Sequence, residues 1–394
     1  MEPALMASTA TQTAGTPADH TGRPSVEAIV PPRLPEGIDT PALLIDLDIA
    51  ERNSRRLADE LGSRGITLRP HAKTHKSIGL ARLQLETGSK GITAGNLGEA
   101  EVLADGGIDD LFVAYPIWAE GPKARRLRAR HDRRGVRLLV GFDSIGGAER
   151  LAAAVQVSGR PLRVMLELDP GYHRTGVLPE DAGTVARAAK GFGLEVVGLF
   201  THGGHGYAGV DAVASAAADE VRTLRAGRDA LRAESIDVEL LSAGSTPTAL
   251  GAAASPVGEI RAGTYLVGDR QQVTLGSVAP EDIALWVAAT VVSTAAPGQV
   301  VVDAGAKTLT KDVAPYLDGH GYLPAYPAAI IEKVSDYHGN VRIPAGAPAP
   351  KLGEVVAIVP NHCCPVIDLR DTFLVLRDGA IAGTWPVDAR GRSG

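Results

Sequence analysis

The feature that most constrains the fold of this chain is a regular alternation of short apolar runs with amphipathic helical stretches. Apolar runs occur at residues 65–69, 91–94, 111–115, 136–141, 162–168, 194–200, 237–241 and 258–266, and helical stretches lie between most of them. Strands that alternate with helices are typical of parallel βαβ units. Eight such strands over about 230 residues predict a (β/α)8 TIM-like barrel. A doubly wound open sheet is the alternative, because the pattern alone does not prove closure.

The pattern changes on both sides of this region. After residue 273, short runs rich in Val, Ile and Thr replace the helical periodicity, and Asp378-Gly379 is typical of a hairpin turn. We therefore expect a barrel over residues 37–272 and a mainly antiparallel β domain over 273–394. Residues 40–47 predict a first strand, with Asp48 as N-cap of the following helix. Residues 1–36, without hydrophobic periodicity, are expected to form a disordered tail.

Composition argues against several classes of function. The formal net charge is -6, whereas nucleic-acid binding usually needs a basic face. No apolar run is long enough to span a bilayer, and the tail lacks the apolar core of a signal peptide. The two cysteines are adjacent, at 363 and 364, and cannot form a disulfide framework. A reducing, cytoplasmic compartment is therefore expected.

Polar and glycine-rich residues follow several of the predicted strands, and Lys73 is the most informative of them. It comes directly after the run 65–69, in the segment 69–76. A lysine at a barrel mouth, partly desolvated and near other cations, has a lowered pKa and becomes nucleophilic toward carbonyl groups. A solvated surface lysine is the alternative. Chemistry in a barrel gathers at the carboxyl ends of the strands, which favours the first interpretation.

The later strand ends add a candidate phosphate site. Residues 242–248 form a small-residue loop with hydroxyls and free N–H groups that runs into a short helix. That geometry suits a phosphate group, and an ordinary helix cap is the alternative. Arg261, close to a glycine, is a candidate contact for a phosphate or a ring.

The segment 360–365 carries a candidate metal pair. His362 and Cys364 are two positions apart, so their side chains would point the same way on an extended segment. An imidazole and a thiolate are natural zinc ligands, and two of them would leave an open site for water or substrate. The alternatives are a buried cysteine pair beside a structural histidine, or a strained vicinal disulfide.

Taken together, these motifs resemble the D-threonine aldolase and D-serine dehydratase branch of the fold-type III, alanine-racemase-like pyridoxal-phosphate enzymes. Residues 70–76 look like the cofactor-lysine motif of that branch, and the segments 171–176, 199–202 and 260–265 follow in the family order. The likeness runs from about residue 38 to the C-terminus. It implies pyridoxal 5'-phosphate as cofactor and an alanine-racemase-type barrel followed by a β domain.

The resemblance also assigns roles to individual residues. Lys73 would hold the cofactor covalently, Arg174 would approach its phenolic oxygen, and His202 would lie against its ring. The residues implied for the phosphate are Ser245, Thr246, Gly263 and Thr264, with Tyr265 nearby. The further implied pocket residues are Tyr172, His205, Tyr207 and Arg261. His362 and Cys364 match the divalent metal pair of this branch, with zinc expected and manganese or magnesium as alternatives.

The implied function is that of a lyase acting on small D-3-hydroxy amino acids. Dehydratases of the family have a His-x-Cys pair where the aldolases more often have His-x-Asp, so Cys364 favours β-elimination to a 2-oxo acid and ammonia. Lys73 would then remove the α-proton. Retro-aldol cleavage to glycine and an aldehyde, with His205 or a metal-bound hydroxide as base, is the alternative.

Other classes are kept as rivals. A racemase would need a second base, for which Tyr316, Tyr322, Tyr326 or Tyr337 is available. A non-catalytic cofactor-binding protein would consist of the barrel alone, and a cofactor-free sugar or phosphate barrel would be colourless. The resemblance implies a homodimer. The net charge and the absence of a long apolar run predict neither a nucleic-acid nor a membrane partner.

Overall fold

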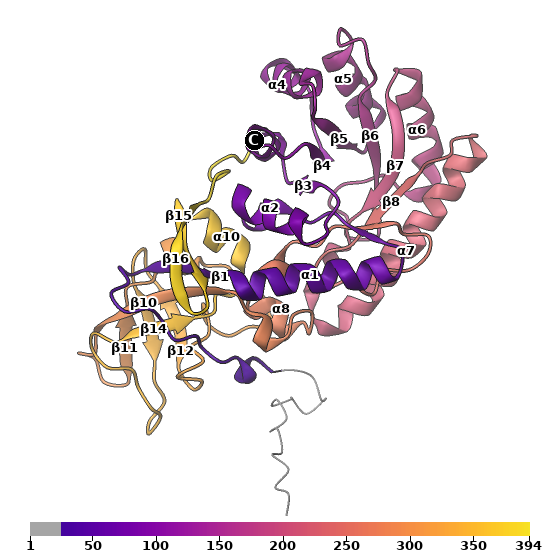
Figure 1. Cartoon of the computed structure of the whole chain (residues 1–394). Coiled ribbons are helices and arrows are strands. Elements are labelled where there is room, and N and C mark those ends of the chain that lie inside the picture. The colour runs from indigo at the N-terminus through magenta and orange to yellow at the C-terminus, as the bar shows by residue number, and fades with distance from the viewer. Residues whose placement is uncertain (1–24) are drawn as a thin grey trace, which may run out of the picture.

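The computed structural model describes residues 25–394 and shows a parallel eight-stranded barrel beside a second sheet (Figure 1). Around the barrel the strands follow the order β3-β4-β5-β6-β7-β8-β9-β2. Lys90 N and Thr93 N donate to the carbonyl oxygens of Leu68 and Pro70, each at 2.8 Å, so the ring closes between β2 and β3. The predicted barrel is confirmed. The strands are β2 (Thr67–Leu68), β3 (Ile92–Ala94), β4 (Asp110–Pro116), β5 (Arg137–Phe142), β6 (Arg163–Leu168), β7 (Glu195–Thr201), β8 (Leu240–Ala243) and β9 (Glu259–Ile260).

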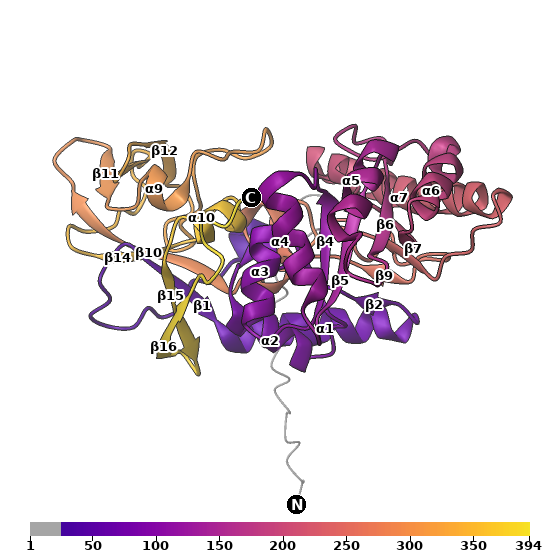
Figure 2. The same cartoon turned by 90° about the horizontal axis from the view of Figure 1, so that it is seen from above.

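Helices cover the outside of the barrel (Figures 1 and 2). They are α1 (Leu47–Ser63), α2 (Ile78–Glu86), α3 (Leu97–Asp105), α4 (Gly121–Asp132), α5 (Ile145–Val155), α6 (Ala182–Gly191) and α7 (Val210–Ala233). The short helix α8 (Arg270–Thr274) follows the barrel and bonds to the β domain, where Arg270 N donates to Pro360 O at 3.0 Å. The expected N-cap of α1, Asp48, was wrong by two residues. Asp46, rather than Asp48, accepts hydrogen bonds from the N–H groups of Asp48 and Ile49, both at 3.0 Å, because the helix already begins at Leu47.

The second sheet is mostly antiparallel and runs in the order β12-β13-β11-β10-β1-β15-β16, with β14 paired to β10. One strand from the start of the chain belongs to it: β1 pairs with β10 antiparallel and with β15 parallel, although the expected domain boundary placed residues 40–47 with the barrel. Asp378 and Gly379, with φ of 49° and 72°, form the predicted hairpin turn. The strands are β1 (Ala42–Asp46), β10 (Leu285–Ser293), β11 (Gln299–Val302), β12 (Ile330–Val334), β13 (Gly339–Arg342), β14 (Val355–Ile358), β15 (Thr372–Arg377) and β16 (Ala380–Pro386).

Part of the expected tail is ordered against this domain. Residues 26–28 form a 3-10 turn, and the neighbouring Ile29 is buried in an apolar cluster with Trp286 and Tyr322. Residues 25–36 thus differ from the disordered tail expected over residues 1–36, because burial of the apolar Ile29 side chain holds this segment against the β domain. The remainder of the expected tail, residues 1–24, lies outside the described residues.

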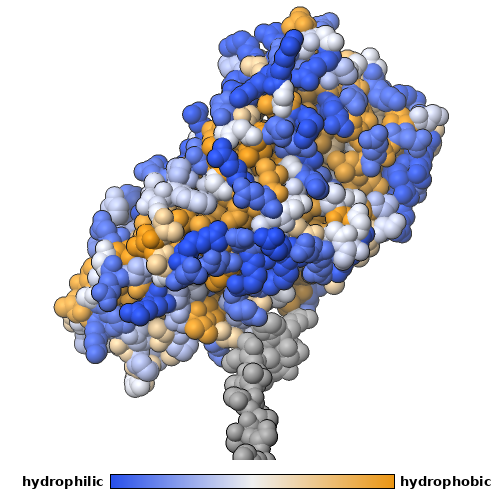
Figure 3. Space-filling view, viewed as in Figure 1, coloured by the Kyte–Doolittle hydropathy of each residue, from blue (hydrophilic) through white to orange (hydrophobic). Residues whose placement is uncertain are grey.

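The helix α1 presents a polar surface to the solvent. Its outer face carries Arg52, Arg55, Arg56 and Asp59 and forms a hydrophilic band (Figure 3). In the part of the chain that the structure describes, none of the helices combines the length and apolar character that crossing a membrane requires.

The two parts meet where the turn after β2 packs on α10 (Cys363–Asp368). Lys76 Nζ is 2.7 Å from Asp368 Oδ1 and largely buried. The C-terminal segment then returns to the barrel: Ala389 N donates to Lys76 O at 2.9 Å, and Arg126 donates to the carbonyl of Gly394. Figure 2 shows this end of the chain beside α3 and α4. These contacts set the β domain against the mouth of the barrel.

Candidate active site

A cavity of about 600 Å³ opens at the carboxyl ends of the barrel strands, against the first residues of α10. Loops after β2, β6, β7, β8 and β9 form most of its wall. The site residues expected from the sequence that line it are Lys73, Tyr172, Arg174, His202, Tyr207, Ser245, Thr246, Arg261, Gly263, Thr264, His362 and Cys364. The barrel and the β domain thus contribute to one cavity.

Lys73 lies in a short 3-10 turn, η2 (Ala72–Thr74), directly after β2. His71 caps this turn, because its Nδ1 accepts a hydrogen bond from Lys73 N at 3.4 Å. The loop after β9 approaches closely at Gly263, where a Cβ atom would lie 2.5 Å from Thr74 Oγ1. Glycine is therefore required at this position for the loop to reach the lysine turn.

The cavity is electropositive. Lys73, Arg174 and Arg261 all face it, together with the half-buried His71 and His202. Burial lowers the pKa of His71 and of His202 well below the ordinary value, and the neighbouring cations lower both further. Both imidazoles are therefore neutral at pH 7. A concentration of positive charge in a partly enclosed cavity favours an anionic ligand.

Arg261 forms the floor of the cavity and is fully engaged by its surroundings. Its guanidinium donates to Ser242 Oγ at 2.5 Å and to Thr201 O at 2.6 Å. It also lies over the rings of Phe112 and Phe200, at 5.8 and 5.3 Å from their centroids. Burial lowers the pKa of Arg261, but the side chain remains a cation because arginine titrates far above neutral pH.

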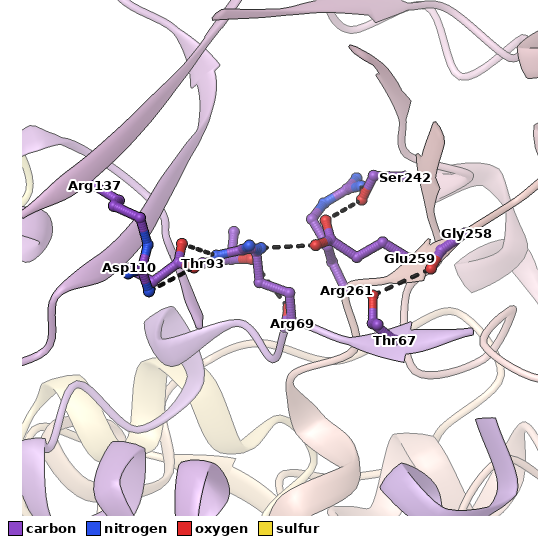
Figure 4. A network of polar contacts seen from close by, with 9 residues as sticks. All are labelled: Thr67, Arg69, Thr93, Asp110, Arg137, Ser242, Gly258, Glu259 and Arg261. Atoms are coloured by element: carbon purple, nitrogen blue, oxygen red, sulfur yellow. Dashed lines mark hydrogen bonds and ion pairs between the residues drawn. The ribbon is translucent and has the colours of Figure 1, made fainter. Parts of the chain in front are cut away.

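A chain of buried polar groups supports this floor from below (Figure 4). Ser242 Oγ donates to Glu259 Oε1 at 2.7 Å, and Glu259 Oε2 accepts from Arg69 Nε at 2.7 Å. Arg69 also pairs with Asp110 at 2.6 Å, and Asp110 accepts from the exposed Arg137. Arg69 lies between the carboxylates of Glu259 and Asp110, so these three charges avoid the cost of an unpaired ion inside the barrel.

Glu220 of α7 ties two walls of the cavity together. Its side chain is fully buried, and Oε1 accepts hydrogen bonds from Gly203 N at 2.8 Å and Gly244 N at 2.9 Å. Gly203 follows His202 and Gly244 precedes Ser245. One carboxylate oxygen therefore fixes both the loop after β7 and the loop after β8.

The hydroxyls of the candidate phosphate loop are only partly satisfied by the protein. Thr246 Oγ1 accepts from Tyr265 N at 3.0 Å, and Ser245 N donates to Thr248 Oγ1 at 3.0 Å. Thr264 Oγ1 is buried without a hydrogen-bond partner within residues 25–394. A buried unpaired hydroxyl is costly, so this cradle suits a ligand that accepts hydrogen bonds.

The candidate metal pair meets in a way that differs from the expectation. His362 is extended, with φ -140° and ψ 112°, but α10 begins at Cys363. The two side chains are therefore brought together by the first turn of a helix and not by a strand. Cys364 Sγ is 3.5 Å from Thr74 Oγ1, next to the lysine turn. Both cysteines are free, so no vicinal disulfide forms.

The electrostatics of the pair favour a thiolate beside an imidazolium, and a metal ion would bind by replacing a proton of the imidazolium. A hydrogen bond with Cys363 and the neighbouring His362 hold the pKa of the Cys364 thiol well below its ordinary value. Burial lowers the pKa of His362, but Cys364 and the carboxylates of Asp269 and Asp312 outweigh it and raise the pKa to about 10. Within residues 25–394, no group of three or more His, Cys, Asp or Glu side chains is arranged to hold a metal ion. The pair would therefore form an open site.

Two expected site residues do not line the cavity. His205 Nε2 faces Asp219 Oδ2 of α7 at 3.1 Å, because the turn that carries His205 packs against that helix. The hydroxyl of Tyr265 accepts from Gln84 at 3.0 Å, on the outer side of the barrel. The four tyrosines considered as a racemase base, Tyr316, Tyr322, Tyr326 and Tyr337, are likewise absent from the cavity of their own chain.

Several residues that line the cavity had no role assigned to them from the sequence. His71 stands in the lysine motif itself, so its position was a usable signal. Tyr115, Gln271 and Asp312 also line the cavity. Asp312 lies in an irregular segment far from His362 in sequence, and no periodicity or motif connects the two. Its place in the site follows only from the tertiary fold.

Comparison with known proteins agrees with this geometry. Residues 45–271 match the model of the family "Alanine racemase, N-terminal domain", and residues 284–376 match the "Putative serine dehydratase domain". The chain is 33% identical to D-threo-3-hydroxyaspartate dehydratase of Delftia sp. strain HT23, over 88% of this chain and 97% of that protein. It is 32% identical to D-threonine aldolase of Arthrobacter sp., over 93% of this chain and 97% of the relative.

A solved structure shows the same fold. It is a cysteine-to-alanine variant of D-threo-3-hydroxyaspartate dehydratase in the metal-free form, with a TM-score of 0.82 and 31% identity, over 89% of this chain and 97% of that chain. The two family models match the barrel and the β domain in turn, and the two relatives match most of the chain. The chain belongs to the D-threonine aldolase and D-serine dehydratase family of alanine-racemase-like proteins.

Proposed function

We propose that this protein is a pyridoxal-phosphate- and metal-dependent lyase for D-3-hydroxy amino acids, of the D-serine or D-threonine dehydratase type. The observation that carries the proposal is the meeting of two reactive groups in one cavity. Lys73 lies next to Thr74, and Thr74 Oγ1 is 3.5 Å from the Cys364 thiol. An amine suited to hold a carbonyl cofactor and a pair of soft metal ligands therefore share the same space. Relatives that are a dehydratase and an aldolase support a lyase.

The residues of the cavity fit pyridoxal 5'-phosphate. Lys73 would hold the cofactor covalently, Arg174 would lie near its phenolic oxygen, and His202 would lie against its ring. The phosphate would be held by Ser245, Thr246, Gly263 and Thr264. This assignment is supported by the unpaired Thr264 hydroxyl and by the positive charge of the cavity.

The pair His362 and Cys364 fits a divalent metal ion. Imidazole and thiolate ligands favour zinc, whereas manganese and magnesium prefer oxygen ligands. When bound, the cofactor supplies an electron sink at the substrate Cα, and the metal supplies a Lewis acid for the substrate β-hydroxyl. The metal-free form of a cysteine variant of the related dehydratase supports a metal in this family.

Residues of this chain would transfer the proton, enclose the cofactor and support it from below. The Lys73 amine would take the proton from the substrate Cα. The neutral His71 and His202 would enclose the cofactor without adding positive charge. Arg261 would be kept rigid beneath it by Ser242 and Thr201. Loss of the β-hydroxyl and hydrolysis of the product give a 2-oxo acid and ammonia.

The alternative is retro-aldol cleavage to glycine and an aldehyde, and the relative D-threonine aldolase favours keeping it. His205 is poorly placed to act as the base of this reaction, because its imidazole faces Asp219 and not the cavity. The two reactions are separated by incubating cofactor- and zinc-loaded protein with D-threonine and identifying the products by mass spectrometry. We expect 2-oxobutyrate with ammonia. Glycine with acetaldehyde would establish the alternative.

Two sets of variants test the assigned roles. Lys73→Ala should lose the visible absorption band of lysine-bound pyridoxal phosphate, and an intact band would refute the lysine assignment. His362→Ala and Cys364→Ala should keep this band but lose most turnover, as should chelator treatment. Unchanged turnover in all three would refute the metal. The homodimer stays a prediction, which sedimentation of the loaded protein tests.

A further inference from the structure

One carboxylate of the β domain, that of Asp312, contacts the imidazole of His362 in the metal pair. Asp312 Oδ2 lies 2.5 Å from His362 Nδ1, although fifty positions separate the two residues. Asp312 belongs to the irregular segment between α9 (Ala306–Leu309) and β12, and its side chain also lines the cavity. This contact occupies one ring nitrogen of His362 and leaves Nε2 as the nitrogen available to a metal.

Such a contact has a known chemical consequence. A histidine that binds a metal through one nitrogen donates the N–H of the other, usually to a carboxylate or carbonyl, and this second bond fixes both the tautomer and the orientation of the ring. Here Nδ1–H would donate to Asp312, and the lone pair of Nε2 would face the metal. We infer that Asp312 is a positioning residue that fixes His362 in the tautomer and orientation required for metal binding. The inference rests on the proposed function, because it concerns the same metal.

The segment that carries Asp312 is itself held by the neighbour of His362. Asn361 is 2% exposed, and its Nδ2 donates to Asp312 O at 3.2 Å and to Gly319 O at 2.8 Å. Arg270 anchors the same segment through Asp318. Asn361 therefore fixes the backbone of Asp312, and the Asp312 carboxylate in turn fixes the imidazole ring of His362.

Two other roles for Asp312 are less consistent with these contacts. A direct metal ligand would make a cluster of three with His362 and Cys364, and residues 25–394 contain no such cluster. A mere surface ion pair would contribute little to stability and would need no buried asparagine behind it. The geometry points to an effect on metal affinity transmitted through the imidazole.

The test is the zinc dissociation constant of pyridoxal-phosphate-loaded protein, measured by competition with a chromophoric chelator. Asp312→Ala should bind zinc roughly 10- to 100-fold more weakly, the range known for such outer contacts. Asp312→Asn keeps an acceptor for Nδ1–H and should lose less affinity. The absorption band of the bound cofactor should stay unchanged in both. Asp336→Ala, which removes an exposed carboxylate of the same domain paired with Lys307, is the matched control and should bind zinc as the wild type does.

A double-mutant cycle separates positioning from a general loss of structure. Asn361→Ala should weaken zinc binding alone, and it should have little further effect when Asp312 is already alanine. Fully additive losses would overturn the inference, as would wild-type zinc affinity in Asp312→Ala. If the wild-type protein itself binds no zinc at His362 and Cys364, the metal part of the proposed function fails and the inference fails with it.

Discussion

Glu167 lies at the end of β6, where its side chain is 2% exposed and accepts a hydrogen bond from Thr175 at 2.9 Å. Its second oxygen is buried without a partner in the part of the chain that the structure describes. Burial raises the pKa of Glu167 to about 7. In the unfolded chain the same group titrates near its ordinary value, so the folded state holds this proton over a wider pH range than the unfolded state.

This difference predicts how Glu167 affects stability. Between about pH 4.5 and pH 7 the folded cofactor-free protein binds more protons at Glu167, so its stability falls as the pH rises, by at most about 3 kcal/mol. Glu167→Gln removes this contribution. The variant should therefore gain stability relative to the wild type when urea unfolding is compared at pH 8 and at pH 5. An equal difference between the two proteins at both pH values would contradict the raised pKa.

Individual site residues were accessible from the sequence where they belong to local motifs. Lys73, Arg174 and His202 each follow a recognisable strand, and the closed barrel brings them into one cavity. Asp312 and Glu220 were not accessible, because their partners are far away along the chain and neither stands in a motif. Their roles depend on hydrogen bonds that only the folded protein defines.

At the scale of the elements, α7 does more than cover the barrel. It projects Glu220 inward between two loops, and one oxygen of this residue accepts from both Gly203 and Gly244. The helix thereby sets the spacing between His202 and the phosphate loop at Ser245. Buried carboxylates are costly, so this arrangement persists because it satisfies two buried N–H groups.

Variants of Glu220 test this function of α7. Glu220→Gln keeps the accepting oxygen and should bind pyridoxal phosphate nearly as tightly as the wild type. Glu220→Ala leaves two buried N–H groups unpaired, each costing about 1–3 kcal/mol, and should weaken cofactor binding at least tenfold. The measurement is cofactor titration followed by absorbance, with circular dichroism to verify folding. If glutamine and alanine weaken binding equally, the charge of Glu220 matters rather than its hydrogen bonds.

The secondary structure shows the same division between local and distant information. Strand and helix periodicity is local, so seven of the eight barrel strands were predicted within three residues. The eighth predicted run, 258–266, extends six residues beyond β9, which ends at Ile260. The pairing of β1 with β10 and β15 was not predicted, because the apolar residues of a strand do not indicate which sheet the strand joins. The helix α10 was also missed, because residues 360–365 were interpreted as an extended segment at a strand end. Pro365 lies in the first turn of α10, where proline is well tolerated.

At the scale of the molecule, the C-terminal segment couples the β domain to the lysine turn. Ser77, the N-cap of α2, makes no side-chain capping bond. Asp388 supplies the missing acceptor from the other end of the chain: its Oδ2 accepts from Ile78 N at 2.7 Å. A carboxylate at a helix N-terminus is favourable for both hydrogen bonding and the helix dipole. The helix after Lys76 is therefore capped by the last segment of the β domain.

This cap predicts a stability effect that crosses the domain boundary. Asp388→Ala should lower the free energy of unfolding by about 1 kcal/mol, the typical cost of losing an N-cap. Asp388→Asn keeps the acceptor and should recover most of that loss. Urea unfolding followed by circular dichroism measures both. Because α2 begins just after the lysine turn, cofactor affinity should fall with stability in the alanine variant. Wild-type behaviour of Asp388→Ala would show that the other contacts, such as the Lys76–Asp368 pair and the bond from Ala389 N to Lys76 O, hold the lysine turn without this cap.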